Sequence, residues 1–132
     1  MAIRAISALV GLALAAPGVA FADPPALARL YVFHAANDVL RYNTPLTIDG
    51  KFLKGGVMPG ACVFVDLPPG GYMLHSMSED SLHLDVSGGQ DVFVELRGVS
   101  KDLGSSGVID QATPVLFTSP ADISHCLPVE KP

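Results

Sequence analysis

Short apolar runs with a period of two, separated by turns rich in glycine and proline, constrain this chain more than any other feature. The runs are Leu30–Phe33, Thr47–Phe52, Cys62–Leu67, Tyr72–Met77, Leu82–Val86 and Val92–Arg97. Alternation of this kind is typical of strands, and no useful length of the mature part has helical period. The spacing predicts an all-β fold, an immunoglobulin-like or transthyretin-like antiparallel β-sandwich of about six to eight short strands.

The turn residues predict where the strands end. Asp49-Gly50 favours a type I′ hairpin turn, because both residues tolerate positive φ. Pro68–Gly71 and Ser87–Gly89 indicate further turns, and the polar, Gly/Ser-rich stretch 101–107 indicates a mobile loop. Ser119–Ser124 begins with serine, proline and then an acid in the first turn, which predicts a short C-terminal helix.

The first 22 residues have the pattern of a cleavable signal peptide. Arg4 is followed by the apolar run Ile6–Ala16, which is too short to span a bilayer. Small residues precede the expected cleavage site between Ala22 and Asp23. An uncleaved N-terminal anchor is the alternative. We therefore expect a periplasmic or secreted protein with no membrane anchor after cleavage.

Residues 23–132 are expected to form a single domain, with a core over 28–98 and a C-terminal segment over 99–132. This part carries 7 basic and 13 acidic side chains, a net charge of −6 with neutral histidines. Such a surface offers little to phosphate, so nucleic acid is not an expected partner.

Two cysteines, Cys62 and Cys126, are the only ones in the chain. An even number after export suggests a disulfide. Two free thiols are the alternative, with Cys62 packed as a small apolar residue in its strand. Sequence alone leaves both possibilities open, because pairing also depends on geometry.

The order of these features resembles a bacterial family of small exported proteins known as domain of unknown function family 2846. The resemblance covers roughly residues 28–98 and rests on Arg29–Phe33, Ile48–Gly50, Val65–Gly70 and Val86–Val94. It departs at Tyr72, where the family usually has a histidine after the Pro-Gly turn, and no lipid-attachment cysteine is present. The resemblance implies a β-sandwich in the envelope and no assigned activity.

Histidines in neighbouring strands suggest one possible metal site. Alternation puts His75 on the opposite face from Leu74, and places His83 and Asp85 opposite Leu82, Leu84 and Val86. If the two strands pair so that Leu74 faces Leu84, His75 faces His83 and the pair can share a metal with Asp85. Two solvated histidines on a wet face are the alternative. The chain has no other set of residues that would hold a cofactor.

No catalytic constellation can be named. Gly104–Gly107 has loop composition and is no nucleophile elbow. Cys62 lies within an apolar run, where a packed side chain is the ordinary role. A non-enzymatic protein is therefore expected.

An apolar surplus remains on the polar faces of two strands. Tyr31 and Phe33 alternate with Leu30 and Val32, and Phe93 alternates with aliphatic neighbours. The C-terminal segment can cover these rings, or they can form an exposed patch that binds an envelope protein or an extracellular ligand. The preferred function is such a protein- or ligand-binding module, and the alternative is an envelope metal-binding protein using the surface histidines.

Overall fold

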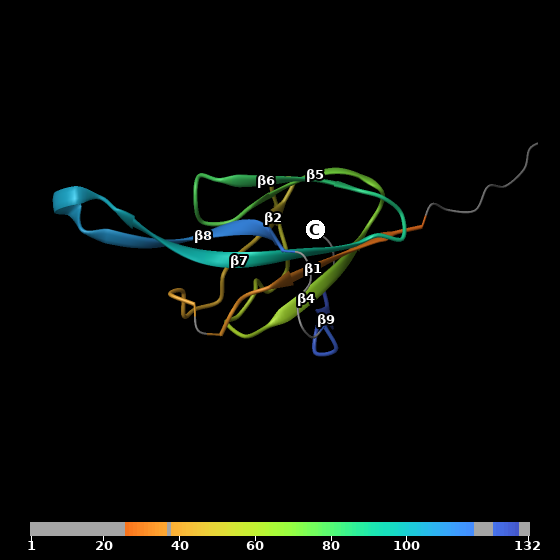
Figure 1. Cartoon of the computed structure of the whole chain (residues 1–132), viewed down its shortest axis with the longest axis horizontal. Helices are drawn as coiled ribbons and strands as arrows, with labels where there is room; N and C mark the ends of the chain where they lie inside the picture. Colours follow the sequence, from red (N-terminus) through yellow and green to blue (C-terminus); the bar gives the residue numbers. More distant parts are fainter. Residues whose placement is uncertain (1–25, 37, 118–122, 130–132) are drawn as a thin grey trace, which may run out of the picture.

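A computed structural model describes residues 26–36, 38–117 and 123–129 (Figure 1). The expected signal peptide, its cleavage site at Ala22 and Asp23, and most of the expected helix Ser119–Ser124 lie outside these residues. The described chain forms two β-sheets packed against each other, so the all-β, sandwich-like prediction is confirmed. None of its helices is long and apolar enough to cross a membrane.

The larger sheet has five strands in the order β8-β7-β1-β4-β9. These are β1 (Ala28–Phe33), β4 (Cys62–Leu67), β7 (Asp91–Asp102), β8 (Val108–Phe117) and β9 (Leu127–Pro128). β1 lies in the middle, antiparallel to β4 and parallel to β7, so the prediction of a purely antiparallel sandwich is wrong. Alternation along a strand is the same for either direction of its neighbour, so the sequence pattern does not reveal strand direction. β8 continues the sheet antiparallel to β7, and the short β9 runs parallel to β4.

The smaller sheet has four strands in the order β3-β2-β5-β6. These are β2 (Thr47–Ile48), β3 (Lys51–Phe52), β5 (Gly70–His75) and β6 (Ser81–Val86). β2 and β3 form the predicted hairpin, with φ of 51° at Asp49 and 81° at Gly50. Positive φ at both central residues is what a type I′ turn requires.

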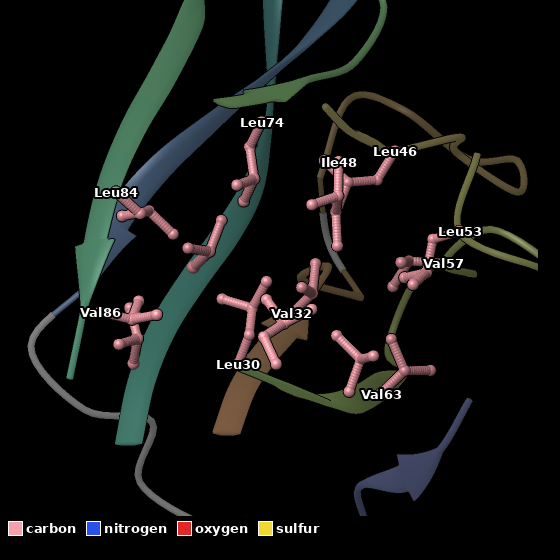
Figure 2. Close-up of a cluster of buried hydrophobic side chains, with 14 of the residues drawn as sticks. Leu30, Val32, Leu46, Ile48, Leu53, Val57, Val63, Leu74, Leu84 and Val86 are labelled. Atoms are coloured by element: carbon pink, nitrogen blue, oxygen red, sulfur yellow. The ribbon is translucent and has the colours of Figure 1, made fainter. Parts of the chain in front are cut away.

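The core lies between the sheets and is almost entirely aliphatic (Figure 2). Leu30 and Val32 of β1 face Leu74 and Leu84 of the smaller sheet across it. These side chains are at most 5% exposed, because alternation along each strand directs every second residue inward. Burial of this continuous apolar layer is the main force that holds the two sheets together.

β7 and β8 form a long hairpin that extends well beyond the rest of the molecule (Figure 1). The stretch 101–107, predicted as a loop, is instead the end of this hairpin. Lys101 and Asp102 still belong to β7, and the short helix η1 (Gly104–Ser106) turns the chain into β8. The loop prediction therefore holds for 103–107 and is wrong only at Lys101 and Asp102. Polar composition does not distinguish an exposed strand end from a loop when neither face of the strand is buried.

Cys62 and Cys126 form a disulfide with a Cα–Cα distance of 4.5 Å. The bond joins β4 to the chain just before β9 and closes a separation of 64 residues in sequence. This settles the question that the sequence left open. Disulfides persist in oxidising compartments, so the bond fits an exported protein.

Candidate binding face

The outer face of the five-stranded sheet, which points away from the core, carries an aromatic cluster. Alternation along β1 directs Tyr31 and Phe33 to this face, while Leu30 and Val32 face inward. Phe64 pairs directly with Tyr31 from β4, and Phe93 pairs directly with Tyr31 from β7. The three neighbouring strands therefore place their rings side by side.

The rings pack mainly against one another. Tyr31 stacks on Phe93 with centroids 5.1 Å apart and planes 14° from parallel, and it lies 5.8 Å from Phe64 at a tilt of 52°. Phe117 of β8 meets Phe33 edge-on at 5.1 Å. Offset-stacked and edge-on pairs are the favoured aromatic arrangements and add stability beyond burial alone.

An ion pair borders the cluster at the start of β1. The guanidinium of Arg29 donates from Nε and Nη2 to the two carboxylate oxygens of Asp66, at 2.8 and 3.1 Å. It also lies 4.1 Å above the ring centroid of Phe64, within range of a cation–π interaction. The hydrogen bonds from Arg29 lower the pKa of the Asp66 carboxyl, and those to Asp66 raise the pKa of the guanidinium.

The predicted contact residues differ in exposure. Tyr31 is only 7% exposed, because its neighbours in the cluster cover it, whereas Phe33 and Phe93 are half-buried. Phe117, from the C-terminal segment, covers part of Phe33. The accessible part of the cluster therefore comes from Phe33, Phe64, Phe93 and Phe117, and little of it from Tyr31.

A pocket of about 260 Å³ lies beside the cluster at the disulfide. Its lining comprises Phe33, His34, Ala35, Ala36, Gly60, Ala61, Cys62 and His125. Phe33 belongs to both the aromatic cluster and the pocket, so the two features form one continuous surface. Sites for drug-sized ligands begin at about 300 Å³, so this pocket suits a single side chain or a small apolar group.

His34 presents little polar surface to the pocket. The ring is 1% exposed, with Nδ1 3.2 Å from the Val57 carbonyl and Nε2 3.0 Å from Oδ2 of Asp38. Both partners are hydrogen-bond acceptors, and a neutral imidazole donates to one of them at a time. Asp38 also accepts the backbone N–H groups of Gly98 at 2.7 Å and Val39 at 2.9 Å. The ring is thus buried, and both of its nitrogens face groups of the protein and not the pocket.

Close approach of this network to β7 depends on a glycine. A Cβ at position 98 would lie 2.6 Å from Cγ2 of Val39 and 2.8 Å from a carboxylate oxygen of Asp38. Sequence reasoning missed His34, Asp38 and Gly98. The available signal was the isolated glycine within a strand pattern, which often marks close approach of another segment.

The expected pairing of His75 with His83 is wrong. In the structure His75 pairs with Ser81, and His83 pairs with Met73. The histidines still share the outer face of the smaller sheet, as diagonal neighbours. Asp85 follows two residues after His83 and lies over Gly71. Among the described residues, no group of three or more His, Cys, Asp or Glu side chains is placed to hold a metal ion.

Comparison with protein-family models gave no match, and comparisons with curated proteins and with solved structures gave none either. The resemblance to the family of unknown function therefore stays a prediction. The geometry of the outer face has to support any functional conclusion by itself.

Proposed function

We propose that the protein is an exported, non-enzymatic module that binds another envelope protein or an extracellular ligand through the outer face of its five-stranded sheet. The proposal includes a sandwich of the immunoglobulin-like or transthyretin-like type, and the family resemblance favours an envelope setting. The disulfide supports export, since such bonds are rare in reducing compartments.

One observation carries this proposal: Phe33 lines an apolar pocket and also belongs to the cluster of partly exposed aromatic rings. Interfaces concentrate binding energy where an aromatic or aliphatic anchor enters a pocket surrounded by water-excluding contacts. Here Ala35, Ala36 and Ala61 leave room for such an anchor from the partner. Phe33 extends the apolar surface beyond it.

The same pocket argues against catalysis. Its cysteine is in a disulfide, so it offers no thiolate nucleophile. Both ring nitrogens of His34 already lie within hydrogen-bond distance of the Val57 carbonyl and the Asp38 carboxylate. A nucleophile activated by a free base, which covalent catalysis requires, is therefore not assembled from the groups that line this pocket.

Site-specific photo-cross-linking tests the proposal. A benzophenone amino acid replaces Ala36 at the pocket, or Lys51 on β3 as a matched control, because both positions are exposed. We expect cross-linked products from position 36 in cells that export the protein, and few from position 51. Equal yields from both positions, or none from position 36, would contradict the proposal.

Metal binding at His75 and His83 is the second candidate. It is favoured by Met73, which lies directly opposite His83 and two residues before His75 on the same face. Thioether and imidazole ligands together suit Cu(I), and Asp85 adds a carboxylate nearby. Equilibrium dialysis with Cu(I) and with Zn(II) should show binding that a His75→Ala, His83→Ala double variant loses. Equal uptake by both proteins would eliminate this function.

A further inference from the structure

The long edge of the five-stranded sheet is protected. The carbonyl of Ala112 in β8 points away from the sheet and accepts the N–H groups of Met77 and Ser78, at 3.2 and 3.0 Å. Pro114, two residues further along, points its backbone to the same side and has no N–H to offer. A loop that hydrogen-bonds to an edge strand, and a proline within that strand, both hinder its pairing with another chain. β3 and β9 are short, with two residues each.

β6 forms the other long edge, and its free groups can be located from β5. Asp49 N donates to the Met73 carbonyl, and Met73 N donates to Oδ1 of Asp49, both at 2.8 Å. The backbone of Met73 therefore points toward β2, so its pair with His83 is of the non-hydrogen-bonded kind. It follows that the N–H and C=O of His83 point to the open side, as do those of Ser81 and Asp85.

This edge has none of the protection found on β8. It is six residues long and contains neither lysine nor proline. Within the described residues, no strand pairs with its open side, and Figure 1 shows β6 at the periphery of the molecule. An unprotected edge of this length is a template for pairing with a further strand.

We propose that β6 pairs antiparallel with β6 of a second copy of this chain, with Leu84 on the two-fold axis. In this register His83 lies opposite Asp85 of the partner subunit, and the two-fold axis repeats the pair. Both pairs are of the hydrogen-bonded kind, because the backbones of His83 and Asp85 point outward. The interface is isologous, as closed symmetry requires.

Charge complementarity favours this register, and it favours β6 of a second copy as the partner strand. A shift by two residues places His83 opposite itself, or Asp85 opposite itself. Two Asp85 carboxylates directly opposed destabilise a strand pair, and a register with His83 opposite itself lacks both of the stabilising imidazole–carboxylate pairs. On the inner face the same register extends the buried row of Leu84 and Val86 across the axis. The dimer leaves the aromatic face free, since that face belongs to the other sheet.

Sedimentation equilibrium of the mature protein tests this proposal with a charge swap. We expect a reversible dimer, and Asp85→Lys should weaken it about tenfold or more, because two unfavourable pairs replace two favourable ones. The double variant His83→Asp, Asp85→Lys restores opposite charges and should recover most of the affinity. Asp80→Lys makes the same change of charge in the preceding turn and should leave the dimer unchanged.

The outcomes are distinct. A protein that is monomeric up to about millimolar concentration overturns the proposal. So does a dimer that Asp85→Lys leaves intact, or one that the double variant fails to restore. Circular dichroism of each variant shows that its fold is retained, which is expected because His83 and Asp85 are exposed.

Discussion

The inner and outer faces of the five-stranded sheet come from the same strands but hold their side chains in different ways. Inward residues such as Val32, Val65 and Val94 are at most 2% exposed, because a second sheet covers them. Outward residues such as Phe33 and Phe93 are half-buried, and neighbouring rings supply much of their cover. The inner face therefore stabilises the fold, whereas the outer face leaves apolar surface accessible for contact.

The disulfide at the end of the outer face should give the largest effect. Replacing Cys62 and Cys126 by serine removes a covalent tie across 64 residues. We expect the free energy of unfolding to fall by about 4 kcal/mol, since the unfolded chain regains the entropy of the closed loop. Urea unfolding without reductant measures the difference. A loss below about 1 kcal/mol would show that packing alone secures β9 and the pocket wall.

Truncation on the inner face comes next. Leu30 is 1% exposed within the core, and Leu30→Ala should cost about 3 kcal/mol through lost burial and the cavity left behind. Leu127, 67% exposed at the sheet edge, is a matched control. Leu127→Ala should stay within about 0.5 kcal/mol of the wild type. Similar losses in both variants would contradict the assignment of the core.

Truncation on the outer face should cost less. Phe93→Ala removes the stack on Tyr31 and a half-buried ring, for an expected loss of about 1–2 kcal/mol in urea unfolding. The covering neighbours can partly close over the gap. A loss larger than that of Leu30→Ala would reverse the comparison, because the outer cluster would then be a second core and a poor binding face.

The smallest effect concerns the ion pair beside the cluster. Because Arg29 lowers the pKa of Asp66, the pair stabilises the fold above the ordinary carboxyl pKa, about 3.9. This stabilisation is lost as pH falls through the lowered value in the folded state. The effect is small, since solvent screens both side chains. Urea midpoints at neutral and acid pH should therefore differ slightly more for the wild type than for Asp66→Asn. An identical pH dependence would show that the pair contributes nothing.

Local patterns predicted the all-β class and several individual strands, but not β8, the second half of β7 or the parallel pairings. β4 has the expected bounds, Cys62–Leu67, and the Asp49-Gly50 turn has the expected backbone angles. Alternation also placed Tyr31, Phe33 and Phe93 on the face opposite the core. These features depend on residues that are neighbours in sequence, so one amino-acid sequence was sufficient to predict them.

Features that depend on pairing between distant segments could not be predicted from the sequence. A shift of two residues in β5 and β6 keeps every side chain on its face, so alternation could not exclude the wrong pairing of His75 with His83. The loop between the strands set the register instead. The pocket was missed for a similar reason, since it joins Phe33, Ala61 and His125 from separate parts of the chain.

The most direct test of the central claim is to fill the pocket and measure cross-linking from position 36. Ala35→Leu adds apolar volume where the partner's anchor would enter, at a pocket position outside the hydrophobic core. We predict that cross-linked product is lost while the urea midpoint stays close to that of the wild type. An unchanged yield from a folded Ala35→Leu variant would contradict the assignment of this face as the binding surface.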